Sequence, residues 1–277
     1  MTSLHLNLMT AAYVEEDEEL LTGNRDYSVE PLLKRRAVVH LFCRDANGKR
    51  YVIRDWRGVF KPYLFVPSRS DNKEGLHDFF GRYVKRLEVE LPRNVPSTRE
   101  DFKFTDEADI LFEKRFLIDK KIRCGLKVDI TPGQPAMIGP APDLDIQPRK
   151  WYYDFEMAAT GDINPRNADF PIVLASAFDS YTDNLYAFLN RPPMITVKEL
   201  KKVFERVRKA WDTRGFKVLL WDCPNEFQTV SQYIQQIRIV DPDQLIAHNG
   251  DRFDFPYLFY RCQKKRWRIM KSMSPLG

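Results

Sequence analysis

The stretch WYYDFEM, Trp151 to Met157, places two carboxylates, Asp154 and Glu156, inside an otherwise aromatic and apolar run. Such a run predicts a buried β-strand over 150–157, in which side chains alternate between two faces. Asp154 and Glu156 therefore share one face, and Phe155 between them turns into the core. Two ionised carboxylates this close repel each other unless a positive charge lies between them. Oxygen ligands without His or Cys favour Mg²⁺ or Mn²⁺, so the stretch indicates a divalent-cation site.

The acid-x-acid spacing also has an ordinary explanation. A chain with 39 acids among 277 residues is expected to contain about five such spacings by chance. Most of them are solvent-facing positions on strands. The cation site is the stronger interpretation here because the flanks are apolar and because a second cluster follows later in the chain.

That second cluster is LIAHNGDRFDFPYL, Leu245 to Leu258. It predicts a strand over 244–248, a turn at Asn249-Gly250 and a helix over 254–265 that Phe253 and Asp254 open. Each polar residue has a structural alternative: Asp254 as a helix cap and Asn249 as a turn former.

The second half of the chain alternates between strand and helix patterns. Further strands are predicted at 172–178, 184–189 and 216–221, and further helices at 196–213 and 226–239. Three strands followed by alternating helix and strand predict an α/β domain with a mixed sheet.

The first part of the chain is predicted to be rich in β-structure. AVVHLFC and RYVIRDW form a hairpin around Asn47-Gly48, and KPYLFVP follows as another strand. Apolar residues at three- and four-residue steps predict helices over 74–91 and 108–121. The acidic run EEDEE, residues 15–19, is expected to be a solvated loop.

Residues 131–149 contain five prolines and two glycines without periodicity, which is typical of a linker. We therefore expect two domains, 1–149, including this linker, and 150–277. The expected fold class is mixed α+β (α/β), with a β-rich N-terminal domain followed by the mixed-sheet domain.

Composition excludes several classes of protein. The four cysteines and four histidines show no spacing typical of zinc sites or disulfide frameworks. No apolar run is long enough to span a membrane and no signal peptide is recognisable, so a cytoplasmic location without a membrane partner is expected. Residues 255–277 contain six basic residues and no acid, a block that fits either a phosphate backbone or a solvated tail.

Together the two clusters resemble a known family. A DxE pair on a strand, followed by NxxxFD between a strand and a helix, resembles the first two exonuclease motifs of archaeal family B DNA polymerases. VDPDQLIAHNGDRFDFPYL is similar to that family along its whole length. VVHLFCRDANGKRYVIRDWRGVFKPYLFVP and ILFEKRFLIDKKIRCGLKV resemble its N-terminal domain, so the resemblance covers nearly the whole chain.

The resemblance implies an RNase H-like domain that removes mispaired 3′ nucleotides with two Mg²⁺ or Mn²⁺ ions. Asp154 would bridge both ions, Glu156 would hold one ion and help to place the attacking water, and Asp254 would bind the second ion. Asn249 and Phe253 would hold the frayed 3′ end of the DNA.

The resemblance also implies a template-base pocket in the N-terminal domain that senses uracil in single-stranded template DNA. The matching positions are Pro62, Tyr63, Phe112 and Arg115, with Tyr13 as a further one. The family usually has a proline where this sequence has Leu111. Without the resemblance, these aromatic residues would be assigned to an ordinary core.

A third family motif, YxxxD, is expected well beyond Asp254, but the sequence contains no Asp or Glu after that residue. The acidic motifs of a polymerase palm do not occur in it either. We therefore expect an N-terminal portion of a polymerase with an incomplete exonuclease domain, either truncated or one part of a split enzyme whose remainder is its partner. Such a chain alone should be inactive or weakly active.

Two alternatives stay open at this point. The chain could be a stand-alone RNase H-like 3′-to-5′ exonuclease with an unusual fourth ligand. It could also be a non-catalytic DNA-binding module that recognises template uracil.

Overall fold

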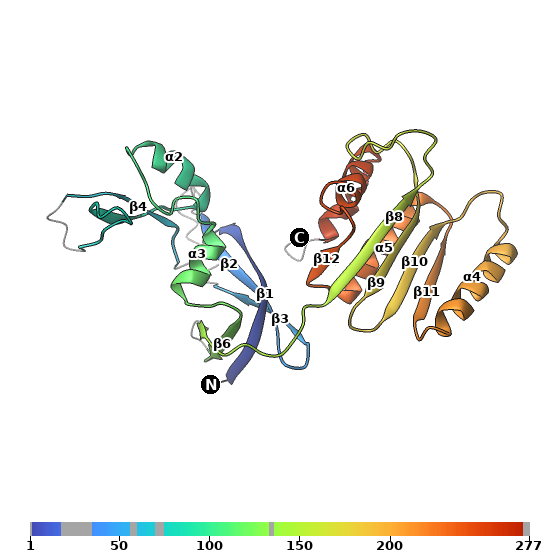
Figure 1. Ribbon diagram of the computed structural model, residues 1–277, viewed down its shortest axis with the longest axis horizontal. Coiled ribbons are helices and arrows are strands. Elements are labelled where there is room, and N and C mark those ends of the chain that lie inside the picture. Colours follow the sequence, from blue (N-terminus) through green and yellow to red (C-terminus); the bar gives the residue numbers. More distant parts are fainter. Residues whose placement is uncertain (1, 18–34, 56–59, 70–74, 133–135, 274–277) are drawn as a thin grey trace, which may run out of the picture. The chain divides into compact units, whose positions relative to one another are not determined.

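The computed structural model describes residues 2–17, 35–55, 60–69, 75–132 and 136–273. The chain forms two compact units, Met1–Ile146 and Gln147–Gly277, and each has its own sheet and core (Figure 1). The first unit is rich in β-structure and the second combines a mixed sheet with helices. This confirms the predicted fold class.

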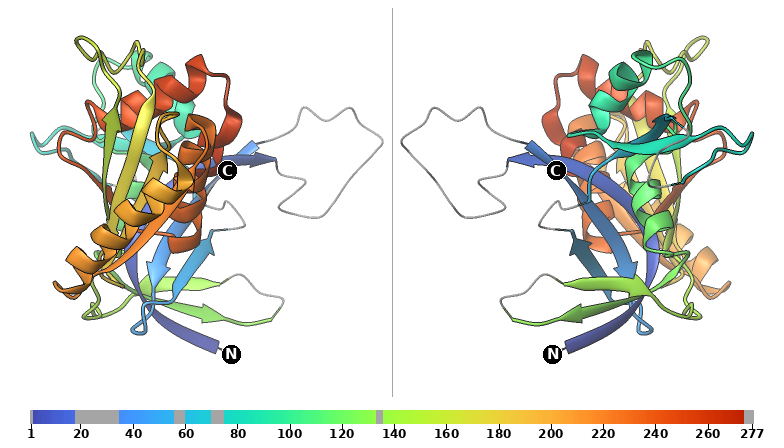
Figure 2. Two further views of the ribbon diagram at one scale, coloured as in Figure 1. Left: turned by 90° about the vertical axis from the view of Figure 1, so that its right-hand side faces the viewer. Right: turned by 90° about the vertical axis from the view of Figure 1, so that its left-hand side faces the viewer.

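An antiparallel five-stranded sheet with the order β3-β2-β1-β6-β7 dominates the first unit. Its strands are β1 (Thr2–Asp17), β2 (Arg35–Arg44), β3 (Arg50–Arg54), β6 (Gly125–Ile130) and β7 (Met137–Pro140). The long strands β1 and β2 run side by side (Figure 2). The predicted β2–β3 hairpin is confirmed: Gly48 has a φ of 77°, and the Asp45 carboxylate accepts the backbone N–H groups of Asn47 and Lys49 at 2.9 and 3.0 Å.

One loop prediction in this unit is wrong for the residues described, and a second is wrong in part. Glu15 to Asp17 belong to β1, where Glu16 lies opposite Arg36 of β2. Opposite charges on facing strands stabilise the pairing, so the acids do not end the strand. The predicted linker 131–149 includes the boundary between the two units, after Ile146, but it also contains β7, which pairs with β6 of the first unit.

The helix predicted over 74–91 is also wrong for the described residues 75–91. They form a hairpin tip and then β5 (Val84–Glu88), which pairs with β4 (Tyr63–Pro67). The Asp78 carboxylate accepts backbone N–H groups within the tip, and Gly81 adopts a φ of 79° that few other residues tolerate. These two residues reverse the chain, so the apolar spacing that imitates a helix comes from a turn followed by a strand.

The helices in the described part of the first unit are η1 (Pro92–Asn94), α2 (Val95–Glu100) and α3 (Phe112–Asp119). Helix α3 lies within the predicted range 108–121 but begins later, because Leu111 is its extended N-cap residue. Phe112 and Phe116 of α3 join the core of the large sheet.

The sheet of the second unit has the order β11-β10-β9-β8-β12. Its strands are β8 (Lys150–Met157), β9 (Ile172–Asp179), β10 (Asn184–Asn190), β11 (Lys217–Cys223) and β12 (Gln244–Ile246). The pairs β10–β11 and β8–β12 are parallel and the other two are antiparallel. Strand β8 thus lies between β9 and the short strand β12, which pairs only with residues 150–152 of β8, so no strand among the described residues pairs with its C-terminal half on that side.

The helices of the second unit are α4 (Val197–Asp212), α5 (Glu226–Val240), α6 (Asp254–Lys264) and η2 (Arg268–Met273). The side chains of α5 and α6 share one core with Trp151, Tyr153 and Phe155 of β8. Helix α4 lies beside β11 (Figure 1) and begins with a capping box between Thr196 and Glu199. Among the described residues, the helices are all too short or too polar to cross a membrane.

Candidate functional site

Strand β8 presents its two acids to the open face of the sheet, as predicted. Trp151, Tyr153 and Phe155 are buried, whereas Asp154 and Glu156 are exposed on the opposite face. The strict alternation of the strand therefore brings both carboxylates to one surface.

Asp254 is the first residue of α6 and is only 3% exposed. Its carboxylate does not cap the helix: Phe253 occupies the N-cap position, and no side-chain hydrogen bond caps this end. Instead, the backbone N–H of Phe155 stabilises the carboxylate, which places Asp254 against β8 at the point where β12 has ended. The helix-cap explanation for Asp254 is thus wrong, and the residue lies beside the acid pair.

The ionised form of Asp254 is disfavoured by its surroundings when no cation is bound. Burial raises the pKa of Asp254, and the nearby Asp154 carboxylate raises it further, while the Phe155 N–H and His248 oppose the rise. Burial, together with Asp254 and Asp251, raises the pKa of Tyr153 to about 12. The site thus concentrates negative charge around one buried carboxylate, a situation that a bound cation relieves.

The described residues contain no group of three or more His, Cys, Asp and Glu side chains arranged to hold a metal ion. The structure brings Asp154 and Asp254 near each other and places Glu156 on the same face as Asp154. By chemistry, the donors fit Mg²⁺ or Mn²⁺, because all three are carboxylates.

Asn249 and Gly250 form the turn that leads into α6. Asn249 has a φ of 59°, and its backbone carbonyl accepts the N–H groups of Arg252 and Phe253 at 3.0 and 2.9 Å. A Cβ on Gly250 would lie 2.9 Å from the Cβ of Ala247. The turn-former explanation of Asn249 is therefore confirmed for its backbone, while its side chain is exposed. The ring of Phe253 is half-buried, 6.2 Å from that of Tyr257.

An apolar groove of about 390 Å³ borders Asp154 on the open face of the sheet. Its walls include Tyr152 and Phe178 from the sheet and Trp211 from α4. The groove therefore combines aromatic surface with one of the acids.

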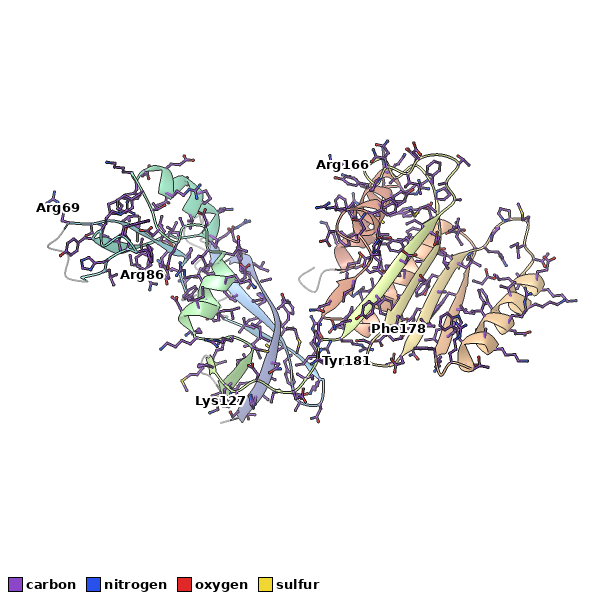
Figure 3. All side chains as sticks on the ribbon, viewed as in Figure 1. Arg69, Arg86, Lys127, Arg166, Phe178 and Tyr181 are labelled. Carbon is purple, nitrogen blue, oxygen red and sulfur yellow. The ribbon has the colours of Figure 1, made fainter. Side chains whose placement is uncertain are left out.

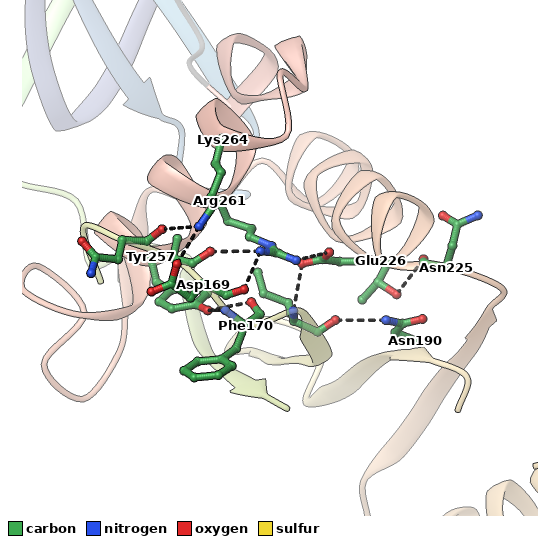
Figure 4. Close-up of polar contacts among 12 residues, drawn as sticks. Asp169, Phe170, Asn190, Asn225, Glu226, Tyr257, Arg261 and Lys264 are labelled. Carbon is green, nitrogen blue, oxygen red and sulfur yellow. Dashed lines mark hydrogen bonds and ion pairs between the residues drawn. The ribbon is translucent and has the colours of Figure 1, made fainter. Parts of the chain in front are cut away.

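A buried ion pair fastens the loop after β8 to both helices (Figure 4). Arg261 of α6 donates from Nε and Nη2 to the carboxylate of Glu226 at 2.7 and 2.8 Å, and from Nη1 to the carbonyl oxygens of Ala168 and Asp169 at 2.9 and 3.1 Å. Glu226 also accepts the backbone N–H of Ile172 at 2.9 Å. We call these contacts the Arg261 network; they fix α6, and hence Asp254, relative to β9 and α5.

The sequence analysis missed the Arg261 network and Asp251. Arg261 could have been found, because it lies seven residues after Asp254 on the buried face that also includes Tyr257 and Leu258. A basic residue on the buried face of a helix requires an acidic partner.

The predicted template-base residues lie together in the first unit, where their side chains pack against one another. Tyr63, Phe112 and Arg115 are buried, and the guanidinium of Arg115 lies 4.6 Å from the centre of the Tyr63 ring. The rings of Tyr13 and Phe112 meet edge to face, 5.4 Å apart. Pro62 is buried beside Tyr63.

Comparisons with known proteins agree with this geometry. The sequence profile described as "DNA polymerase family B, exonuclease domain" matches residues 105–274, more than half of the chain. DNA polymerase 1 of Pyrococcus abyssi is 29% identical over 205 residues, covering 67% of this chain and 20% of the relative. The DNA polymerase of Archaeoglobus fulgidus is 25% identical over 268 residues, covering 84% of this chain and 29% of the relative.

A solved structure shows the same fold. The family B DNA polymerase of Pyrobaculum calidifontis superposes with a TM-score of 0.63 at 17% identity, covering 95% of this chain and 33% of the polymerase. The chain thus spans only about a fifth to a third of these proteins. The matching profile, the acid pair on β8 and the buried Asp254 together show that this chain belongs to the family B DNA polymerases and contains sequence of their exonuclease domain.

Proposed function

We propose that the second unit carries the 3′-to-5′ proofreading site of a DNA-directed DNA polymerase, with the rest of that polymerase as its partner in cis or as a separate subunit. The observation that carries this proposal is the buried Asp254 beside Asp154, an arrangement that favours a bound cation. A purely structural role does not account for a carboxylate buried against a second one.

Asp154, Glu156 and Asp254 would hold two Mg²⁺ or Mn²⁺ ions. Two bound cations stabilise the attacking and leaving oxygens in phosphodiester hydrolysis. The backbone N–H of Phe155 keeps the Asp254 carboxylate oriented toward β8. Asn249 and Phe253 lie on the turn before α6, where they would hold the frayed 3′ end, and the groove beside Asp154 offers aromatic surface to its bases.

Mn²⁺ titration, followed by the electron paramagnetic resonance signal of the free ion, tests the metal site directly. We expect the wild-type protein to bind Mn²⁺, and Asp154→Ala and Asp254→Ala to weaken binding by about tenfold or more. Asp169→Ala is the matched control, since that acid is exposed and pairs with Lys264. Equal Mn²⁺ binding by all four proteins would refute the site.

Hydrolysis is tested separately, with a 3′-labelled single strand and Mg²⁺. We expect any release of the label to disappear with Asp154→Ala and to persist with Asp169→Ala. Release that survives Asp154→Ala would assign the activity to other residues.

The finer proposal, uracil sensing by the first unit, is supported by the clustering of Tyr13, Tyr63, Phe112 and Arg115. Titration of matched single strands containing either uracil or thymine tests it. Equal affinity for the two strands would remove uracil recognition from the proposed function.

A further inference from the structure

The hairpin tip between β4 and β5, residues 77–83, carries two aromatic side chains that belong to neither core cluster of the first unit. Phe79 is 97% exposed and Phe80 is 76% exposed. They occupy the two central positions of a tight turn, where Asn, Asp, Ser, Pro and Gly are the usual residues. Two large apolar rings at these positions gain no stabilisation from burial. The formation of the turn therefore does not explain why they are there.

The tip is preformed by its own hydrogen bonds. The Asp78 carboxylate accepts the backbone N–H groups of Phe80 and Arg82 at 2.9 and 2.8 Å, and the Asp78 carbonyl accepts that of Gly81 at 3.0 Å. Burial opposes ionisation of Asp78, but the hydrogen bonds from the Arg82 backbone and guanidinium outweigh it and lower the pKa. The rings are therefore presented on a fixed scaffold, which lowers the entropic cost of binding a ligand.

The side chain of Arg82 contacts both the Phe80 ring of the tip and the Phe104 ring of the same unit. The guanidinium of Arg82 lies 3.7 Å from the centre of the Phe104 ring and 5.2 Å from that of Phe80. Phe79 meets Phe80 edge to face at 5.6 Å, with an angle of 87° between the planes. This geometry leaves the Phe79 ring accessible to a flat partner.

Exposed basic side chains lie near the tip. Arg69, Arg82 and Lys85 are exposed, and Arg69 lies at the same end of the first unit as Arg86 (Figure 3). Within the described residues 75–88, the acids are Asp78 and Glu88, and they pair with Arg82 and Arg86. Cations beside exposed rings fit a ligand with both flat aromatic groups and negative charge.

We propose that this tip binds single-stranded DNA, with Phe79 and Phe80 stacking on bases while Arg69, Arg82 and Lys85 contact phosphates. The inference rests on the proposed DNA-processing function and adds a binding site to it. The site is separate from the predicted template-base pocket, whose rings are buried. A protein partner with an apolar cleft would match the rings but not the surrounding cations.

Fluorescence anisotropy with a labelled oligothymidylate at low salt tests the proposal. Each lost ring should weaken binding by about tenfold, so Phe79→Ala/Phe80→Ala should lose about a hundredfold. Phe79→Leu/Phe80→Leu should lose nearly as much, because leucine preserves apolar area but has no ring to stack. Ile118→Ala/Val52→Ala is the control, since it removes two other exposed apolar side chains of the same unit, and it should bind like wild type.

Wild-type affinity in the alanine variant would overturn the proposal, and wild-type affinity in the leucine variant would overturn base stacking by the two rings. The alanine variant should retain normal Mn²⁺ binding, so this site and the metal site can fail separately. If the wild-type protein binds no single-stranded DNA while its Mn²⁺ site is intact, the hairpin proposal falls and the metal site stands.

Discussion

Glu226 and Asp254 are both first residues of helices in the second unit, yet they have opposite surroundings. Glu226 opens α5 and faces Arg261, with the backbone N–H of Ile172 as a further donor. Asp254 opens α6 and faces Asp154. A helix N-terminus stabilises a negative charge in both cases. The difference therefore comes from the neighbours that the tertiary structure supplies.

This comparison separates a structural acid from a functional one. The carboxylate of Glu226 accepts three hydrogen bonds from this chain, and these contacts stabilise the fold. Asp254 is buried at a cost that the described residues only partly offset. An acid kept in such surroundings is a candidate for function.

Removing the partner of the structural acid should have the largest effect on stability. Arg261→Met leaves Glu226 buried without its cation, so the free energy of unfolding should fall by about 3–5 kcal/mol. Urea denaturation followed by circular dichroism measures the change. Adding Glu226→Gln to this variant should recover part of the loss, because the unpaired charge is then absent.

Lys264→Met is the matched control for this prediction. Lys264 pairs with Asp169 on the surface next to the network, and both side chains are about half exposed. Its loss should be less than about 1 kcal/mol. Similar losses for Arg261→Met and Lys264→Met would show that the Arg261 network does not fasten α6.

The acids that form the metal candidate could be predicted from sequence because their signal is local. The alternation in WYYDFEM places Asp154 and Glu156 on one face, and the burial along β8 follows this pattern. The position of Asp254 beside β8 depends on the parallel pairing of β12 with that strand. No local pattern encodes this pairing, so the proximity of Asp254 to Asp154 was implied only by the family resemblance.

The failed predictions have the same origin. Residues 75–91 show a helical spacing of apolar side chains, but Phe79 and Phe80 face solvent and Asp78 closes a turn. Pairing with β4 then decides the conformation of Val84–Glu88. Glu16 continues a strand because β2 pairs with β1 there, and its carboxylate pairs with Arg54 of β3. In both regions, long-range pairing outweighs local propensity.

A smaller effect is expected from disturbing the turn that positions the functional acid. In Gly250→Ala, the new methyl group would lie 2.9 Å from the Cβ of Ala247 and 3.1 Å from the Tyr153 hydroxyl. The turn must shift, which should lower the free energy of unfolding by about 1–3 kcal/mol. Mn²⁺ affinity should fall as well, because the shift moves Asp254.

Gly161→Ala is the control for this change, since a Cβ there meets nothing within 4 Å. It should leave both stability and Mn²⁺ affinity unchanged. Normal Mn²⁺ binding by Gly250→Ala would mean that the turn does not position the metal ligands.

Neutralising the functional acid should raise stability in the absence of metal. The raised pKa of Asp254 means that the folded state favours its protonated form. Protonated Asp254 therefore contributes stability to the folded state. This contribution is complete below the pKa of an unfolded Asp, about 3.9, and is lost as pH rises through the higher pKa of the folded state. Asp254→Asn does not lose this stabilisation. In EDTA at neutral pH, its free energy of unfolding should therefore exceed that of the wild-type protein by on the order of 1 kcal/mol.

Adding Mg²⁺ should reverse that order. The ion stabilises the folded wild-type protein by binding, whereas Asp254→Asn lacks a ligand, so only the wild-type melting temperature should rise. Thermal melts at several pH values, with EDTA or Mg²⁺, measure both effects. A wild-type protein that is more stable than the variant in EDTA at neutral pH would contradict the assignment of Asp254 as an uncompensated acid.

The smallest effect is expected at His248, whose charge opposes the raised pKa of Asp254. His248→Gln removes this opposition, so the pKa of Asp254 should rise further, and the free energy of unfolding in EDTA should fall by less than about 1 kcal/mol. NMR titration of the Asp254 carboxyl carbon measures the pKa. His77→Gln in the first unit is the control and should leave that titration unchanged. If His248→Gln leaves it unchanged as well, His248 does not offset the charge of Asp254, and a bound cation becomes the principal means of doing so.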